Sequence, residues 1–336
     1  MKNYKVLFAS SEVDPFAKTG GLADVAASLP KALGTLGQDI RVVMPKYKNI
    51  PKEYVDRMEY LGYIYVDVSW RHQFCAILKL EQDGVVYYFL DNEYYFGRDG
   101  YYGYNDEAER FAFFCKAVIE FLPVVDFKPD IIHCNDWQTG VVSLLLNAHY
   151  RHLEFYRDIR TVYTIHNLKY QGVFPKEVLG ELLGLSWDYF TADGIEFYDK
   201  VNYLKAGIAY SDIINTVSKT YAEEIKTDFY GENLNSILNK RSGDLYGILN
   251  GIDMERNDPA TDERIFANYS KDNMEGKLVN RHMLQKSVGL EERIDIPIIG
   301  IISRLVDQKG FDLIDFVMED LLKMDIQLII LGAGER

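Results

Sequence analysis

The chain is short of cysteine and of long apolar stretches, and each shortage excludes a class of protein. Three cysteines occur in 336 residues, Cys75, Cys115 and Cys134, and none of their spacings is C-x-x-C. This excludes a disulfide framework and a cysteine zinc motif, and it favours the reducing cytoplasm. No stretch approaches the roughly 20 apolar residues of a membrane-spanning helix, and the apolar run before Glu12 is too short for a signal peptide. We therefore expect no membrane partner.

The chain also lacks an excess of positive charge. Asp and Glu number 51 against 37 Lys and Arg, which gives a formal net charge of −14. A nucleic-acid-binding protein has the opposite excess, so we expect no nucleic-acid partner. Surface charges are screened beyond about 8 Å at physiological salt, so a local cluster of Lys and Arg can still bind a phosphate. The 48% hydrophobic content and the length indicate a globular protein of roughly two domains.

The stretch KTGGLADV, residues 18–25, joins an apolar run to a helical pattern. Residues 4–10 (YKVLFAS) predict a buried strand, and apolar residues recur at helical spacing over 22–36. Adjacent glycines allow a ligand to approach the backbone closely and allow unusual dihedrals. The N-terminus of a helix favours an anion, and the lysine adds a positive charge. The turn suits nucleotide phosphates through Lys18, Gly20 and Gly21, and a tight strand-to-helix turn without a ligand is the alternative.

Strand and helix patterns alternate along the chain, which predicts a parallel α/β sheet. Three β-rich runs at 63–68, 74–80 and 85–90, with Asp83-Gly84 as a hairpin signal, predict an antiparallel addition or edge. Other predicted strands are 40–44, 129–133, 161–165, 213–218, 297–302 and 327–331, and predicted helices include 107–121, 281–290 and 311–324.

Polar residues follow two of these strands at their carboxyl ends. Asp136 lies in HCNDWQTG after one strand, and His166-Asn167 lie in TIHN after the next. Polar groups just past the ends of parallel strands face the ligand crevice of an open α/β sheet. Asp136 would accept hydrogen bonds from sugar hydroxyls, although capping of a helix is an equal alternative from position alone. A lone histidine usually has a structural role, but His166 is expected at the same level of the sheet, the strand ends, as Asp136 and Lys18.

Two further segments have ligand-binding chemistry. Residues 91–104 are rich in Tyr and Phe, whose flat rings suit the C–H faces of sugars, although a loop held together by its own aromatic rings is the alternative. SRLVDQKG, residues 303–310, places Arg304 and Lys309 on a second strand-to-helix turn, where a second anion site is expected. Solvation of both charges is the alternative there.

Five motifs in order resemble those of glycogen and starch synthases, the bacterial-type glucosyltransferases of the GT-B fold. They are KTGGLADV (18–25), HCNDWQTG (133–140), TIHN (164–167), LNGID (249–253) and SRLVDQKG (303–310). The resemblance implies an α/β fold of two Rossmann-like domains facing a cleft. Residues 1–250 would form the N-terminal starch-synthase catalytic domain, and residues 251–336 would begin the C-terminal nucleotide-sugar-binding domain, which is incomplete in this chain.

The resemblance further implies a retaining transfer of glucose from ADP-glucose to the 4-hydroxyl at the non-reducing end of an α-1,4-glucan such as glycogen, without a metal or other cofactor. The residues it implies are His166, Arg304 and Lys309 for catalysis, Lys18, Gly20, Gly21, Asn167 and Asp136 for the donor, and Glu12, Asp24, Tyr102 and Tyr104 for the acceptor side.

The family pattern continues well past residue 336, so we expect this chain alone to be a fragment with little activity. A non-catalytic glucan-binding fragment is one alternative. A dinucleotide-dependent oxidoreductase is another, but it would need a complete G-x-G-x-x-G, and only a lone G-x-G stands at 332–334.

Overall fold

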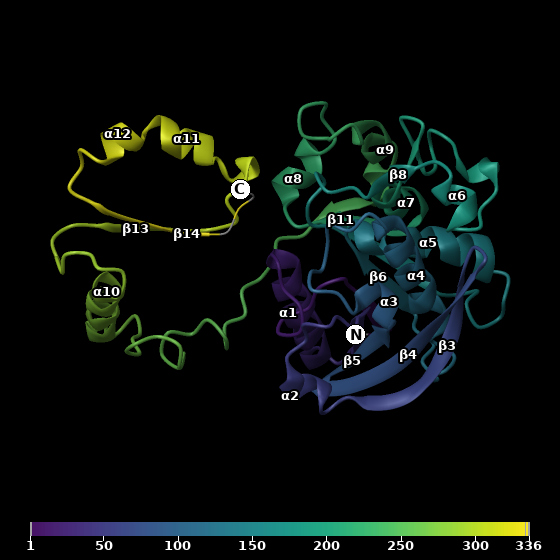
Figure 1. Ribbon diagram of the computed structural model, residues 1–336, viewed down its shortest axis with the longest axis horizontal. Helices are drawn as coiled ribbons and strands as arrows, with labels where there is room; N and C mark the ends of the chain where they lie inside the picture. Colours follow the sequence, from purple (N-terminus) through teal and green to yellow (C-terminus); the bar gives the residue numbers. More distant parts are fainter. Residues whose placement is uncertain (1, 333, 335–336) are drawn as a thin grey trace. The chain divides into compact units, whose positions relative to one another are not determined.

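The computed structural model describes residues 2–332 and 334, and the chain divides into two compact units. The first unit ends at Gly251 and the second begins at Ile252 (Figure 1). The hydrophobic core belongs to the first unit. Among the described residues, every buried hydrophobic side chain except that of Ile296 comes before residue 239.

The first unit is built on a sheet whose described strands have the order β12-β11-β7-β6-β1-β2-β5-β4-β3 (Figure 1). From β12 to β5 all neighbours are parallel, and β4 and β3 extend the sheet in antiparallel pairing beyond β5. The strands are β1 Lys5–Ala9, β2 Asp39–Pro45, β3 Glu59–Val68, β4 Arg71–Gln82, β5 Val85–Asp91, β6 Ile131–Asn135, β7 Arg160–Ile165, β11 Ile213–Thr216 and β12 Leu245–Gly247. The predicted parallel α/β sheet with an antiparallel edge is confirmed.

The turn between β4 and β5 shows why the antiparallel edge was readable from sequence. Asp83 and Gly84 both have positive φ, 52° and 75°. This is the backbone of a two-residue hairpin turn, which a glycine and an aspartate tolerate better than most residues.

Helices cover the sheet of the first unit, and α4 is the most deeply buried of its long helices. Residues 108 and 110–119 of α4 are all buried, including the charged Arg110 and Lys116. The helices are α1 Gly21–Thr35, α2 Lys52–Val55, α3 Glu93–Phe96, α4 Glu107–Glu120, α5 Val141–Leu145, α6 Val178–Glu181, α7 Tyr203–Tyr210, α8 Lys219–Glu224 and α9 Asn235–Lys240, with shorter turns η1 Trp137–Thr139, η2 Leu146–Tyr150, η3 Trp187–Tyr189 and η4 Ser242–Asp244. A small antiparallel sheet joins β8 Val173–Pro175, β10 Lys200–Asn202 and β9 Glu196–Phe197.

The second unit contains a parallel pair, β13 Ile298–Ile302 and β14 Gln327–Leu331, as predicted. Its helices are α10 Glu275–Ser287, η5 Asp307–Lys309, α11 Phe311–Phe316 and α12 Met318–Leu321. The prediction of one helix over 311–324 is wrong, because the backbone leaves the helical region at Val317 (φ −100°, ψ 5°). Packing of an apolar face supplies most helical stability in proteins, and Phe316 is 87% exposed here.

Within residues 2–332 and 334, no helix combines the length and the apolar character needed to cross a membrane.

Candidate functional site

Three neighbouring parallel strands of the first unit end side by side and carry the candidate site. Strand β6 lies between β1 and β7 in the sheet, and Ala9 of β1 pairs with Cys134 of β6. Glu12, Asp136 and His166 follow the carboxyl ends of β1, β6 and β7 respectively. The sheet therefore gathers polar groups from three strands at one edge, where open α/β sheets bind their ligands.

Asp136 links the ends of β6 and β7. Its Oδ1 accepts hydrogen bonds from the backbone N–H groups of His166, at 2.8 Å, and of Asn167, at 3.4 Å. Its backbone has a positive φ of 55°, and in the described chain its side chain makes no capping bond to η1. The alternative of helix capping is therefore wrong. Burial raises the pKa of the Asp136 carboxyl, although the nearby His166 and the two N–H groups oppose that rise.

His166 is held in one tautomer by Asn135. The Asn135 amide nitrogen donates to the carbonyl of Ala9 at 3.0 Å, so Asn135 Oδ1 is the acceptor that faces His166 Nε2 at 2.9 Å. Nε2 therefore carries the proton and Nδ1 is left as an acceptor. Burial lowers the pKa of His166, against the opposing charge of Asp136, which favours the neutral ring. Asn135 was missed as a site residue, although it precedes Asp136 in the quoted motif.

Glu12 connects the glycine turn to the aromatic loop. Its carboxylate accepts from the backbone N–H of Thr19 at 2.5 Å, from the Thr19 hydroxyl at 2.7 Å and from the Tyr102 hydroxyl at 2.7 Å. The same Tyr102 hydroxyl lies 2.9 Å from Ser11 Oγ. Both carboxylate oxygens of Glu12 are thus engaged within the protein, and they fix the position of two loops that border the strand ends.

The aromatic loop is also anchored through Arg110 of α4. This fully buried guanidinium donates to the carbonyls of Tyr95, at 2.8 Å, and Tyr101, at 3.1 Å, and lies 4.8 Å from the centre of the Tyr104 ring. The Arg98 guanidinium also lies over the Tyr104 ring, 4.8 Å from its centre. The aromatic rings of the loop therefore hold the loop itself in place, as one of the two predicted alternatives requires.

Lys18 lies on the turn before α1 but is engaged by acidic neighbours. Its Nζ is 2.5 Å from Asp24 and 3.3 Å from Asp14. Burial lowers the pKa of Lys18, but the two carboxylates outweigh burial and raise it above its usual value. Lys18 is thus a firmly charged ammonium at the entrance of α1.

The two glycines before α1 leave room in front of the helix. A Cβ placed on Gly20 or Gly21 would meet no described heavy atom within 4 Å. Gly20 has φ −162°, which is ordinary extended backbone, so the expected unusual dihedrals are not found there. The two glycines contribute open space at the N-terminus of α1, which is 15 residues long.

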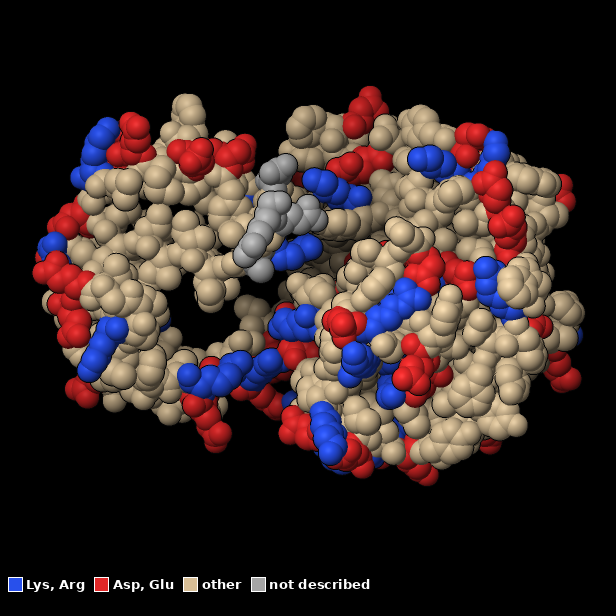
Figure 2. All heavy atoms as spheres, viewed as in Figure 1, with Lys and Arg blue, Asp and Glu red and all other residues tan. Residues whose placement is uncertain are grey.

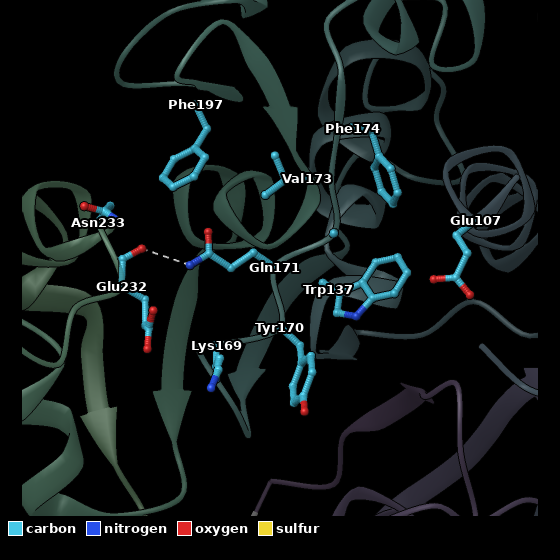
Figure 3. A pocket seen from close by; sticks show the side chains of 11 residues that line it. Glu107, Trp137, Lys169, Tyr170, Gln171, Val173, Phe174, Phe197, Glu232 and Asn233 are labelled. Carbon is cyan, nitrogen blue, oxygen red and sulfur yellow. Dashed lines mark hydrogen bonds between the residues drawn. The ribbon is translucent and has the colours of Figure 1, made fainter. Parts of the chain in front are cut away.

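A pocket of about 410 Å³ opens beside the strand ends of the first unit (Figure 3). In Figure 3 the Trp137 indole lies between Gln171 and Glu107, and the Gln171 amide donates to the carbonyl of Glu232 at 2.9 Å. The lining residues are Glu107, Trp137, Lys169, Tyr170, Gln171, Gly172, Val173, Phe174, Phe197, Glu232 and Asn233. This pocket was not predicted from the sequence, although Trp137 directly follows Asp136 and residues 169–172 come shortly after Asn167.

Gly172 fixes the position of the Trp137 ring. Its φ is +62°, and a Cβ on it would lie 2.4 Å from Cε3 of Trp137. No side chain fits at that distance, so the indole can pack against the backbone only because residue 172 is glycine.

Arg304 and Lys309 belong to the second unit. They lie on the turn between β13 and α11, where Lys309 N–H donates to the carbonyl of Val306 at 2.9 Å. Gly310 follows with a left-handed φ of 71°. Both basic side chains are exposed on that turn.

Basic and acidic side chains are intermixed over the visible face of the first unit (Figure 2). The site residues gathered in this unit are Glu12, Lys18, Gly20, Gly21, Asp24, Tyr102, Tyr104, Asp136, His166 and Asn167.

Comparisons with known proteins identify the family. A family model described as "Starch synthase catalytic domain" matches residues 5–240. A glycogen synthase of Desulforamulus reducens is 52% identical over 99% of this chain and 69% of its own length, and one of Clostridium novyi is 52% identical over 98% and 69%. The solved catalytic domain of starch synthase IV from Arabidopsis thaliana, bound to ADP and acarbose, is 34% identical and superposes with a TM-score of 0.93 over 100% of this chain and 69% of that chain. The chain therefore belongs to the glycogen and starch synthases, a family of hexosyltransferases.

Proposed function

We propose that the protein takes part in glycogen biosynthesis by transferring glucose, with retention, from ADP-glucose to the 4-hydroxyl at the non-reducing end of an α-1,4-glucan. The observation that carries the proposal is the neutral His166, fixed by Asn135 and joined to Asp136 at the ends of three parallel strands. The starch synthase IV domain was solved with ADP and acarbose, which supports a nucleotide diphosphate and a glucan-like sugar as the ligand classes.

The transferring glucose is assigned to His166, Asn167 and Asp136. With Nε2 bonded to Asn135, His166 offers Nδ1 as an acceptor for a sugar hydroxyl. Asp136 already holds the backbone at positions 166 and 167, so its role is to position them. A histidine that is neutral before the sugar arrives needs no proton release to accept that hydrogen bond.

The donor diphosphate is assigned to Lys18 and the glycine turn, with Arg304 and Lys309 as catalytic charges from the second unit. In the reaction the bond between glucose C1 and the diphosphate oxygen breaks, a bond from C1 to the acceptor O4 forms, and the proton of the 4-hydroxyl passes to the departing diphosphate. Negative charge grows on the departing ADP. Preorganised cations stabilise such charge in the transition state, and charge-assisted hydrogen bonds are each worth about 1.5–3 kcal/mol.

The acceptor glucan is assigned to the pocket beside Trp137 and Tyr170. Ligand pockets combine apolar and aromatic walls with a few polar groups, and here Lys169, Gln171 and Glu232 supply the polar groups. Asp24 and Tyr104 complete the proposed acceptor side. Glu12 and Tyr102 belong to it as positioning residues, because the hydrogen bond between them joins two loops that border the strand ends.

The two units are assigned to the two domains of the family. Residues 1–250 are proposed as the N-terminal catalytic domain and residues 251–336 as the start of the nucleotide-sugar-binding domain. The three buried free thiols fit a reducing cytoplasm. Among the described residues of the second unit, Ile302, Phe316 and Leu331 are exposed, at 82%, 87% and 64%, so this small unit leaves several of its large apolar side chains uncovered.

We therefore expect residues 1–336 alone to transfer glucose poorly, because catalysis requires the groups that bind the reactants to be held in position and water to be excluded. A non-catalytic glucan-binding role for this chain is the second candidate, supported by the aromatic pocket.

The test measures incorporation of labelled glucose into glycogen, with ADP-glucose and UDP-glucose as separate donors. One protein is residues 1–336, and the other joins residues 1–332 to the part of the C. novyi relative that lies beyond the matched region. We expect the chimera to be active and to prefer ADP-glucose, with the chain alone at least about tenfold slower. A preference for UDP-glucose would overturn the donor assignment, and equal activity of the two proteins would overturn the expected inactivity.

A further inference from the structure

The hairpin of β3 and β4 presents an aromatic surface to solvent at the end of the large sheet. Tyr65 pairs with Phe74 and Asp67 with His72 across the two strands, so these four side chains share one face. The opposite face is buried in the core through Val66, Val68, Cys75 and Ile77. The outward face is formed by Tyr63, Tyr65, His72 and Phe74, with Trp70 at the turn, and we call these five residues the hairpin aromatic surface.

The rings of this surface pack on one another. The Tyr65 ring stacks on His72 with 4.4 Å between centres and 10° between planes, and His72 Nδ1 lies 2.6 Å from Asp67. Tyr63 lies 5.8 Å from Tyr65 and 5.5 Å from Phe74. Stacking and hydrogen bonding therefore hold the rings in place before any partner arrives, which lowers the entropic cost of binding.

The aromatic residues on this face are not required by the core, because their side chains point outward and polar residues could replace them without loss of core packing. Tyr65 and Phe74 are 49% and 44% exposed, and Trp70 is 82% exposed. Contiguous exposed aromatic residues on a soluble domain mark a binding surface more often than chance. The residues here are rings with polar tips and carry Asp67 and His72 among them, rather than the leucines and isoleucines of a protein core.

We infer that the hairpin aromatic surface binds an α-1,4-glucan chain at a place separate from the transfer site. Aromatic faces stack on the C–H faces of sugars, while tyrosine hydroxyls, His72 and Asp67 offer hydrogen bonds to sugar hydroxyls. A glucan is uncharged, so its binding needs no patch of one charge. The inference rests on the proposed function for the identity of the polymer, and it adds a second place on the protein where that polymer is held.

The hairpin is tied rigidly to the elements that border the pocket. Lys116 of α4 donates to the carbonyl of Asp67 at 2.8 Å, and Arg71 Nε lies 3.1 Å from Glu109 of α4. Asn92, at the start of the aromatic loop, donates to the carbonyl of Phe74 at 2.8 Å. A polymer held on the hairpin is thus held at a fixed place relative to the pocket, which raises the local concentration of its chain ends there.

Retention in native gels that contain glycogen tests the inference on residues 1–336. The variant combines Tyr65→Ser with Phe74→Ser, and Tyr246→Ser is the matched control, an exposed tyrosine on β12 at the opposite edge of the same sheet. Loss of two stacking rings is expected to weaken retention by at least about threefold, while the control retains the wild-type value. Trp70→Ser is a second variant at the turn, for use if the double variant has a lowered Tm.

Three results would overturn the inference. Wild-type retention by the hairpin variants is the first. The second is a wild-type chain that elutes as a dimer in gel filtration and becomes a monomer in the double variant, because the surface would then join two copies. The third is loss of retention in Trp137→Ala but not in the hairpin variants, which would assign all glycogen binding to the pocket. The glucose-transfer assay of the chimera tests the proposed function independently of these three results.

Discussion

Asn135 Oδ1 lies 2.9 Å from Nε2 of His166, and the same side chain donates to the carbonyl of Ala9 at 3.0 Å. One amide thus connects the ends of β1 and β6 with the residue that follows β7. Because both halves of the amide are used, neither it nor the imidazole can rotate without losing a hydrogen bond. This relationship fixes which nitrogen of His166 faces a ligand, and it is the basis of the first prediction.

His166→Ala is expected to lower glucose transfer by the chimera at least about tenfold, the effect of losing roughly 1.4 kcal/mol of transition-state binding. His166→Gln is the matched control, because its amide can donate to Asn135 and still offer an oxygen to the sugar, so we expect partial rescue. The measurement is kcat and KM for ADP-glucose together with Tm. A large fall in Tm, with normal turnover by the protein that remains folded, would make the histidine structural instead.

Lys18→Ala is expected to weaken ADP binding by roughly 1.5–3 kcal/mol, the range for one charged hydrogen bond. Asp24→Asn should act in the opposite direction, since it removes the nearer of the two carboxylates beside the lysine and leaves only Asp14, at 3.3 Å, to compete with phosphate for the ammonium. Isothermal titration calorimetry with ADP compares the two variants in the chimera. Equal affinity in wild type and Lys18→Ala would remove the lysine from the donor site.

Gly172→Ala is expected to displace the Trp137 indole, because the new Cβ would lie 2.4 Å from Cε3. Gly184→Ala is its matched control. Gly184 has a similar φ of +66°, but its Cβ would approach His149 Nε2 at 4.0 Å. Both variants pay about 1–2 kcal/mol for the left-handed backbone, and overpacking adds about 1–3 kcal/mol at Gly172 alone.

Chemical denaturation and maltohexaose binding measure this pair of variants. We expect Gly172→Ala to lose both stability and maltohexaose affinity, and Gly184→Ala to lose a smaller amount of stability with its affinity intact. Matching losses of affinity in the two variants would contradict the assignment of the acceptor to the pocket.

Because His133 is buried, we expect the protein to lose stability in acid. Burial, with a smaller effect of His166, lowers the pKa of His133 from the usual 6.5 to about 3. Between these values the unfolded chain binds a proton that the folded chain does not, so the free energy of unfolding falls as pH falls, by up to about 1.4 kcal/mol per pH unit from this group. Above pH 6.5 His133 is neutral in both the folded and the unfolded chain, so it does not change the free energy of unfolding there.

Urea denaturation from pH 7 to pH 4 measures that slope. We expect His133→Gln to reduce it, because glutamine can replace the Nε2 contact to the Thr164 hydroxyl, seen at 2.6 Å, without taking up a proton. His152→Gln, at an exposed position, is the control and should keep the wild-type slope. A slope unchanged by His133→Gln would assign the acid sensitivity to other groups.

Much of the fold was predictable because local patterns and turn chemistry agree with it. The period of the apolar residues identified the parallel strands, and Asp83-Gly84 identified the hairpin that extends the sheet. The break at Val317 was not predictable, because it depends on whether the apolar face of residues 311–324 is covered, and a sequence pattern does not contain that information.

The candidate site was predictable only where motif and strand end coincide. Asp136 and His166 stand directly after strands, so parallel topology brings them together. Other contacts join residues that lie apart in sequence or on different elements. They are the ion pair of Lys18 with Asp24, the anchoring of the aromatic loop by the buried Arg110, and the contact of Gly172 with Trp137. Their pairing depends on three-dimensional packing, and neither residue spacing nor composition specifies it.

Residues 248–274, which connect β12 to α10, contain neither helix nor strand. Proteases cut segments that can adopt an extended backbone in their active sites, and such segments concentrate in irregular connections of this kind. Brief digestion with trypsin should therefore cut first at Arg256 or Arg264 and release a fragment that ends close to the boundary at Gly251. That fragment retains the buried core, so it is the part of this protein best suited to crystallisation and to soaking with sugars.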